Sequence, residues 1–283
     1  MSPARKAEAI LAPYKKADLH VRTTASMGLV APYEAVEQAR KKGLTAIAIA
    51  DHDSIEAIPI AKLAGEIYDV EVIPAVETTC MEGNNEIHLI GYFIDWKNRT
   101  LTEILEMTEA WRGAQIEQIL EKLKGIGISI SFDEVLKEAG EMSVLSRTHV
   151  AKKLVEKGCA KNTAEAFEKY LGPGCPAYVP RSQLALDETA KILKEAGGVL
   201  ALAHPKFCAS LKILPKLIKL GLSAIEVYHP AHSKEEIQTY QRLAKKYKLI
   251  EVGGSDISRD HAAVGGITVP YSVVEKLKQK LKR

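Results

Sequence analysis

Histidine and acidic residues recur at one end of the apolar runs in this 283-residue sequence. They are Asp18 and His20, then Asp51, His52 and Asp53, then Glu77, His204, His229 and Asp256. His88 differs, because it lies near the start of its apolar run. One histidine after a strand is most often a loop or core residue, but several runs that carry ligand-type residues at the same end favour a shared site.

The donor types predict metal-dependent chemistry. Imidazole and carboxylate donors without thiolate suit zinc, manganese or ferrous iron. A carboxylate such as Glu77 offers two oxygens and could bridge a pair of ions. Two ions would hold a phosphoryl oxygen and generate hydroxide near neutral pH, so the pattern indicates hydrolysis of a phosphate ester.

Apolar runs of strand length alternate with helical patterns on both sides of the middle of the chain. The expected strands cover residues 17–21, 45–50, 71–76, 87–94, 198–203, 224–228 and 249–252. The expected helices include residues 33–42, 55–68, 211–220 and 233–247. This alternation is typical of βα units around a parallel sheet or barrel, whose active site forms beyond the carboxyl ends of the strands. Apart from His88, the ligand-type residues follow that rule.

The middle of the chain has a different pattern. Residues 101–171 form amphipathic helical segments with few strand signals, and a Gly/Pro-rich turn follows at 172–176. We therefore expect residues 1–100 and 177–283 to form one barrel, and residues 101–176 to form a helical insertion.

Composition and charge exclude several classes of protein. The net charge is +3, from 39 basic and 36 acidic residues, so no global field favours nucleic acid or an anionic membrane as a partner. No apolar stretch reaches the length of a membrane span. The four cysteines form no CxxC pair, which argues against a zinc ribbon or a disulfide framework and favours a cytoplasmic protein.

Taken together, the motifs resemble the polymerase and histidinol phosphatase (PHP) family, and within it the small phosphoesterases that act on nucleotides and related phosphomonoesters. The segments that carry the resemblance are DLHVRTTASMG at 18–28, ADHD at 50–53, VE at 76–77, EIH at 86–88, LAHP at 202–205 and GSD at 254–256. It implies a distorted (βα)7 TIM-like barrel with up to three metal ions. The segments SRTH at 146–149 and AYVP at 177–180 are similar to that subgroup's insertion, which caps the active site.

The resemblance also implies how the metal ligands are shared. A first site would use His20, Glu77 and Asp256, but Arg22 stands where the second histidine of an HxH motif belongs. A second site, of Glu77, His88 and His204, is complete. We therefore expect one or two divalent ions, of zinc, manganese or iron.

The third site of the family is expected to be lost. His52 remains, but Met27 and Ser258 stand in place of its Asp and its second His. Met27 is more readily a packing residue than a ligand, because a thioether is too soft for these ions. His261, three residues after Ser258, is an alternative ligand.

Arginine at position 22 changes the expected chemistry. A guanidinium has no lone pair for a metal, but it can neutralise charge or bind phosphate. We expect Glu77, Asp256, Arg22 and His229 to act in catalysis, with His229 as a proton donor to the leaving group or as a structural residue.

The insertion carries further candidates for phosphate recognition. By the resemblance, Arg112, Arg147 and His149 would join Arg22 in binding phosphate, and the alternative for Arg112 is a solvated helix face.

The sequence thus predicts a metal-dependent phosphoesterase that hydrolyses a small phosphorylated metabolite, with nucleotides among the candidates. The alternative is a catalytically impaired PHP-like barrel that binds a phosphorylated ligand, because the metal motifs have departed from the family pattern. A metal-dependent amidohydrolase of another barrel family would need a late bridging lysine or carboxylate that the sequence does not present.

Overall fold

The structure, a computed structural model, describes residues 15–83, 85–140, 144–257 and 263–281. It divides into two compact units, one built from Met1–Thr102 and Leu184–Arg283 and the other from Glu103–Gln183. Each unit has its own apolar core. Among the residues with a described placement, no helix is both long and apolar enough to cross a membrane.

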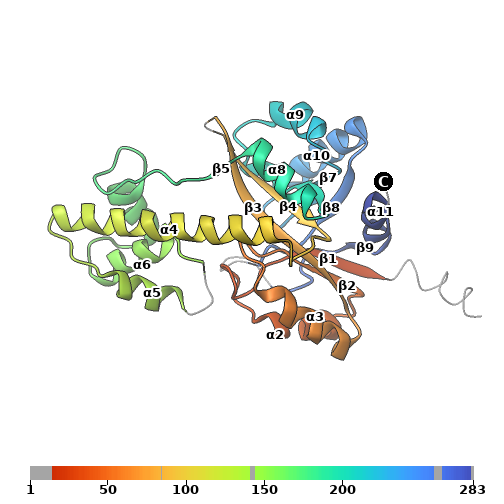
Figure 1. The fold of residues 1–283 in the computed structure, drawn as a ribbon, viewed down its shortest axis with the longest axis horizontal. Helices are drawn as coiled ribbons and strands as arrows, with labels where there is room; N and C mark the ends of the chain where they lie inside the picture. The colour runs from red at the N-terminus through yellow and green to blue at the C-terminus, as the bar shows by residue number, and fades with distance from the viewer. Residues whose placement is uncertain (1–14, 84, 141–143, 258–262, 282–283) are drawn as a thin grey trace, which may run out of the picture. The chain divides into compact units, whose positions relative to one another are not determined.

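The first unit is built on one mixed sheet (Figure 1). Its strands are β1 (Lys16–Val21), β2 (Ala46–Ile49), β3 (Glu71–Glu82), β4 (Asn85–Tyr92), β5 (Leu184–Ala185), β6 (Val199–Leu202), β7 (Ala224–Tyr228), β8 (Ile250–Gly253) and β9 (Val269–Pro270). Their order is β8-β7-β6-β4-β3-β2-β1-β9, with β5 paired to β3. Without the two-residue strands β5 and β9, seven of these nine remain, which is the number expected for a distorted (βα)7 barrel.

One strand of the barrel runs against the others. β4 pairs antiparallel with both β3 and β6, whereas β1, β2, β3 and the series β6, β7, β8 pair in parallel. The amino end of β4 therefore lies at the same edge of the sheet as the carboxyl ends of its neighbours.

The segment after β8 nearly closes the barrel against β1. The amide of Asp256 donates to the carbonyl of His20 at 2.7 Å, and the amide of Ser255 donates to the Asp18 carboxylate at 2.9 Å. Glycine is required at Gly254, because a Cβ there would lie 2.1 Å from the backbone nitrogen of His20. Close approach of these two segments brings Asp256 to His20.

Helices follow most strands of this unit (Figure 1). They are α2 (Pro32–Lys41), α3 (Ala57–Tyr68), α8 (Leu186–Glu195), α9 (Leu214–Lys219), α10 (Lys234–Tyr247) and α11 (Ser272–Leu281), with 3-10 turns at Pro205–Phe207 and Leu211–Ile213. The core inside the barrel comes from alternate strand positions, such as Ile73 and Ala75 of β3, or Tyr92 and Ile90 of β4.

The second unit is helical. It comprises most of α4 (Arg99–Gly125), then α5 (Phe132–Ala139), α6 (Arg147–Glu156), α7 (Thr163–Ala166) and a π-helical turn at Phe167–Leu171. Its core includes Ile116 and Leu123 of α4, Val135 of α5 and Leu154 of α6. The amphipathic pattern of the sequence thus marks helices that share a separate core.

Candidate active site

Strand alternation carries ligand-type side chains onto the inner face of the barrel. Residues two apart in a strand point to the same face, so Glu77 shares the inner face of β3 with Ile73 and Ala75. In the same way His88 shares the inner face of β4 with Ile90 and Tyr92. Because β4 is antiparallel, His88 reaches the mouth from the beginning of its strand. The exceptional position of His88 in the sequence therefore has a topological cause.

Irregular backbone aims other members of the site. The register of β1 against β2 shifts between Asp18 and Val21, around His20, and such bulges redirect side chains next to active sites. His204 and Asp256 have positive φ angles of 21° and 39°, which non-glycine residues adopt only where the surroundings hold them. These residues follow the strand ends as expected, in strained conformations that the sequence does not reveal.

Glu77 is the centre of the cluster. Its carboxylate is fully buried and accepts from Arg22 Nη2 at 2.6 Å. Three imidazoles also face it: His88 Nδ1 at 2.7 Å, His204 Nε2 at 2.7 Å and His20 Nε2 at 3.3 Å. Burial by itself would raise the pKa of Glu77, but the guanidinium and the imidazoles hold that pKa well below its usual range. The carboxylate is therefore ionised.

Asp256 forms a second anionic point beside Arg22. Its Oδ2 lies 3.0 Å from His229 Nε2, and its Oδ1 lies 2.7 Å from Arg22 Nε and 3.7 Å from His20 Nε2. Burial would raise the pKa of Asp256, but His20 and Arg22 lower it. The buried Oδ1 and Arg22 Nε face each other without hydrogen-bond geometry, and neither bonds to any other residue that the structure describes.

Glu226 belongs to the site although the sequence did not single it out. It is fully buried on β7, accepts from the backbone amide of His204 at 2.7 Å and lies 3.0 Å from His20 Nδ1. Burial would lower the pKa of His20, but Glu226 and Asp256 raise it well above its usual value. The only sequence signal is a carboxylate inside the apolar run 224–228.

His52 lies in the same cluster. Ligand atoms of His52, Glu77 and His88 all fall within 4.8 Å of one another. Asp53 Oδ2 lies 3.1 Å from His52 Nδ1, and the Thr79 hydroxyl lies 2.8 Å from His52 Nε2. A carboxylate on one imidazole nitrogen orients the other nitrogen for metal binding.

The histidines of the cluster have shifted acidities. Burial would lower the pKa of His88, but hydrogen bonds with Glu77 and Glu86 raise it to about 9. Burial lowers the pKa of His204, and this effect is larger than the rise caused by the hydrogen bond and charge of Glu77. Adjacent imidazoles with opposite shifts are typical of functional sites.

Two buried carboxylates have structural roles. Asp51 accepts from the amide and hydroxyl of Thr23, each at 2.7 Å, and from the hydroxyl of Ser26. Asp18 accepts from the amide of Gly265 at 2.8 Å as well as from Ser255. Both fix the loops around the cluster, and burial raises the pKa of each.

Three further predicted residues belong to the helical unit. Arg112 Nη1 donates to the Leu145 carbonyl at 3.3 Å, and Arg147 lies over the Phe167 ring at 5.6 Å. His149 Nδ1 accepts from the backbone amide of Ser146 at 3.2 Å at the start of α6. All are held within the helical unit, so their phosphate-binding role stays a prediction. Met27 is half-buried, and Ser258 and His261 lie outside the described residues.

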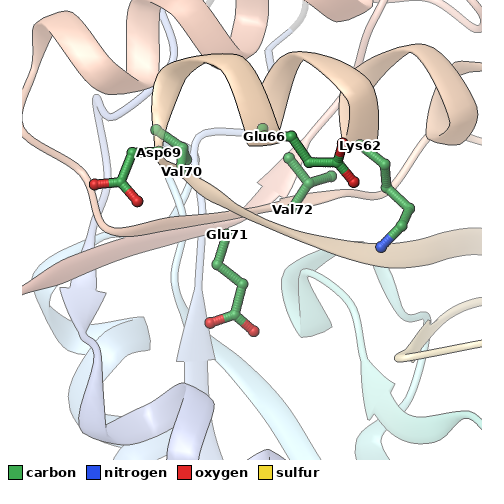
Figure 2. Close-up of a pocket in the computed structure, with 7 residues that line it drawn as sticks. Lys62, Glu66, Asp69, Val70, Glu71 and Val72 are labelled. Carbon is green, nitrogen blue, oxygen red and sulfur yellow. The ribbon is translucent and has the colours of Figure 1, made fainter.

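A surface hollow at the other end of β3 is not the site. It has a volume of about 370 Å³ and is lined by Lys62, Gly65, Glu66, Asp69, Val70, Glu71 and Val72. Figure 2 shows the carboxylates of Glu66, Asp69 and Glu71 and the ammonium group of Lys62 around this hollow, beside α3 and the first residues of β3. The amino ends of barrel strands serve stability rather than chemistry.

The donor set at the mouth suits a divalent metal. Imidazole nitrogens and carboxylate oxygens converge from β1, β3, β4 and the segment after β6, with no thiolate among the ligand atoms described above. Arg22 stands against two of the carboxylates, so the fit is better for one ion than for two.

Comparisons with known proteins identify the class to which the chain belongs. No family model matches the chain. The chain is 32% identical to a 5'-3' exoribonuclease of Haemophilus influenzae, over 86% of this chain and 89% of that protein. It is 28% identical to a 3',5'-nucleoside bisphosphate phosphatase of Chromobacterium violaceum, over 84% and 86% of the two chains.

A solved structure shows the same fold. A protein of Bifidobacterium adolescentis described as a metal-dependent phosphoesterase superposes with a TM-score of 0.83 at 27% identity, covering 95% of this chain and 97% of that one. The chain is a hydrolase of the metal-dependent phosphoesterase class. It belongs to the PHP family, as the sequence motifs predicted.

Proposed function

We propose that this chain hydrolyses a terminal phosphate from a small nucleotide-like metabolite, at a site centred on Glu77. The convergence of His20, His88, His204 and Arg22 on that buried carboxylate is the observation that supports the proposal. A divalent ion held there would polarise a phosphoryl oxygen and lower the pKa of water. Zinc, manganese and iron are the candidates, because all accept imidazole and carboxylate ligands.

Arg22 provides fixed positive charge for the phosphoryl group. Its Nε and Nη2 face Asp256 and Glu77, whereas Nη1 makes no hydrogen bond to any described residue. That third nitrogen is the one proposed to donate to a phosphoryl oxygen, and it would stabilise charge that develops there.

His229 is proposed as the proton donor to the leaving group. Its Nδ1 accepts from the amide of Ala231 at 3.1 Å, so the neutral ring carries its one proton on Nε2. To act as an acid the ring must first take a second proton on Nδ1, in exchange for the Ala231 bond, and it returns to the neutral form when it donates the proton of Nε2. That nitrogen lies 3.0 Å from Asp256 Oδ2, which holds the ring in place. Asp256 thereby orients both the acid and Arg22.

The helical insertion, predicted as residues 101–176, is proposed to cap the site and to contribute Arg112, Arg147 and His149 to phosphate recognition. This role is proposed from the resemblance of the insertion, since Arg112 and His149 are largely buried in their own unit and hydrogen-bonded there. A cytoplasmic location is proposed from the cysteines, since the four of them are free.

Two relatives suggest which substrates to compare. One is named an exoribonuclease and the other a nucleoside bisphosphate phosphatase, so both act on phosphates of nucleotides. We favour the small bisphosphate, because the net charge of +3 gives no strong attraction to a polynucleotide.

The test uses metal-loaded protein with three substrates: a 3',5'-nucleoside bisphosphate, a short 5'-phosphorylated RNA and p-nitrophenyl phosphate. We expect fastest release of phosphate from the bisphosphate. Glu77→Gln should lower kcat/KM at least about 100-fold, since mutation of a residue that only hydrogen-bonds to a metal ligand already lowers metal affinity or activity 10–100-fold. Glu66→Gln, an exposed carboxylate on α3, is the matched control. Metal-replete protein that leaves all three substrates intact would refute the proposal.

A catalytically impaired phosphate-binding barrel is the second candidate. The observation that favours it is the pairing of Arg22 with both Glu77 and Asp256, which neutralises carboxylates that relatives of the family use for metal. It predicts binding of inorganic phosphate without turnover. Turnover by the purified wild-type protein would exclude it.

A further inference from the structure

The two oxygens of Glu77 face different groups. Oε1 lies 2.7 Å from His88 Nδ1 and 2.7 Å from His204 Nε2. Oε2 lies 2.6 Å from Arg22 Nη2 and 3.3 Å from His20 Nε2. We call the side of Oε1, with His88 and His204, the imidazole side. The side of Oε2, with Arg22 and His20, is the arginine side.

The arginine side already contains a cation. A metal at this place would need Glu77 Oε2, Asp256 Oδ1 and His20 Nε2 as ligands. Arg22 lies against both of those oxygens, at 2.6 Å and 2.7 Å. The guanidinium cannot lose its proton and has no lone pair, so it competes with a metal ion for the oxygens and repels it. It is held from both sides inside the barrel, with only 7% of its surface exposed.

The imidazole side has one more donor than the family pattern assigns to it. His52, Glu77 and His88 have ligand atoms within 4.8 Å of one another. Asp53 lies against His52 Nδ1 and therefore fixes Nε2 as the nitrogen with the lone pair. That Nε2 lies 2.8 Å from the Thr79 hydroxyl, which can donate to it until a stronger partner arrives.

We infer that the Arg22 guanidinium replaces one metal ion, and that the chain carries a single divalent ion whose ligands are Glu77, His88, His204 and His52. This inference rests on the proposed function in one respect, that the site binds metal. It does not depend on the reaction proposed there. Four protein ligands leave an open position only in an ion that accepts five or six. Manganese or ferrous iron is therefore favoured over tetrahedral zinc.

The experiment measures metal content per chain by elemental analysis after loading with Mn²⁺ and desalting. Wild type should retain about one ion, and Arg22→His, which restores an imidazole in place of the guanidinium, about two. Electron paramagnetic resonance should show isolated Mn²⁺ in wild type and an exchange-coupled pair in Arg22→His. Arg22→Lys is the control, because it keeps the charge without a metal ligand and should stay at about one ion.

His52 is tested separately by titration with Mn²⁺. His52→Ala should weaken binding of the single ion at least about 10-fold, whereas His232→Ala, a buried imidazole outside the cluster, should not. An unchanged affinity in His52→Ala removes that ligand from the inference.

These outcomes separate the inference from the proposed function. Two ions in wild type, or no gain in folded Arg22→His, would overturn the inference even if the protein is active. One ion in wild type and two in Arg22→His, without turnover on any substrate, would leave the inference standing and refute the proposed reaction. If Arg22→His does not fold, the wild-type count and the wild-type resonance spectrum decide.

Discussion

Glu226 connects two histidines of the site through one buried carboxylate. It lies 3.0 Å from His20 Nδ1 and accepts from the backbone amide of His204 at 2.7 Å. Burial would raise the pKa of Glu226, but the neighbouring His20 lowers it, so the carboxylate stays ionised. The two contacts fix the ring of His20 and the strained backbone at His204.

Glu226→Gln should therefore affect both stability and turnover. The amide cannot serve both contacts equally well, and an imperfectly satisfied buried group costs about 1–3 kcal/mol. Loss of orientation in the two histidines should lower kcat/KM by roughly 10–100-fold. Urea unfolding and phosphate release measure the two effects. The control is Glu251→Gln, which removes a carboxylate that accepts from Tyr228 on the adjacent strand. Wild-type values for both quantities would show that Glu226 does not position the histidines.

Sequence reasoning recovers individual residues unevenly. His20, Glu77, His204 and Asp256 were predictable because strand ends converge at one mouth of a barrel. Glu226 was not predictable. Alternate residues of a half-exposed strand point outward, and a single acidic residue in a five-residue strand fits such an outward position. The pairing of Arg22 with Glu77 and Asp256 depends on a bulge and a positive φ angle, and neither has a sequence signature here.

At the scale of elements, the contact between β1 and the end of β8 controls the shape of the mouth. A Cβ on Gly254 would meet the backbone nitrogen of His20 at 2.1 Å and its Cβ at 2.5 Å. Backbone cannot yield as a flexible side chain does, so the two segments would have to separate. Asp256, two residues later, would move with them.

Gly254→Ala should therefore destabilise the barrel by about 1–3 kcal/mol, the usual cost of forcing atoms into a packed region. It should also lower kcat/KM, since Asp256 would move and it orients both Arg22 and His229. Chemical denaturation and phosphate release test the two effects. Gly113→Ala in α4 provides the contrast, because a Cβ there meets nothing within 4 Å and alanine favours a helix by roughly 0.5–1 kcal/mol. Equal stability of Gly254→Ala and wild type would mean that the mouth tolerates the displacement.

The helix α5 provides an element-scale pH dependence. Ser131 and Glu134 form a capping box, and Glu134 also lies 2.8 Å from Lys157 Nζ. These contacts lower the pKa of Glu134 to about 2, chiefly through the bond to Lys157. A carboxylate with a lowered folded-state pKa stabilises the fold above its unfolded pKa, and that stabilisation disappears as the pH falls through the folded value.

Glu134→Gln should accordingly lower the melting temperature slightly at pH 7, because exposed pairs of this kind contribute little. The difference from wild type should stay constant above about pH 4.5 and vanish as the pH falls towards 2. Thermal unfolding followed by circular dichroism across this range is the measurement. Glu109→Gln, on the exposed surface of α4, is the control. A pH-independent difference would point to helix propensity rather than charge.

For the whole molecule, alternation in the sequence predicted the fold class correctly, because parallel βα units place apolar runs and amphipathic helices at regular intervals. The boundaries were less accurate. β3 continues to Glu82, beyond the expected end at residue 76, since pairing with β4 extends it. β5 and β9 have two residues each and carry no periodic signal. The direction of β4 follows from tertiary pairing, and only the unusual position of His88 hinted at it.

Metal binding should couple to the stability of the barrel as a whole. The proposed ligands come from segments far apart in the chain: His52 follows β2, Glu77 and His88 lie on β3 and β4, and His204 follows β6. The unfolded chain cannot bring these donors together, so an ion that binds only the native state stabilises it by mass action. At about 100 times Kd the gain is about 2.7 kcal/mol.

Addition of Mn²⁺ should raise the melting temperature of metal-stripped wild type by several degrees, and a chelator should reverse the rise. Glu77→Gln should show almost no rise, because it removes the carboxylate that all the other ligands face. Glu66→Gln should respond as wild type does, since Glu66 lies on the exposed surface of α3. Differential scanning calorimetry with and without metal makes the comparison. An equal rise in Glu77→Gln and wild type would locate the stabilising ion away from Glu77, and the proposed centre of the site would be wrong.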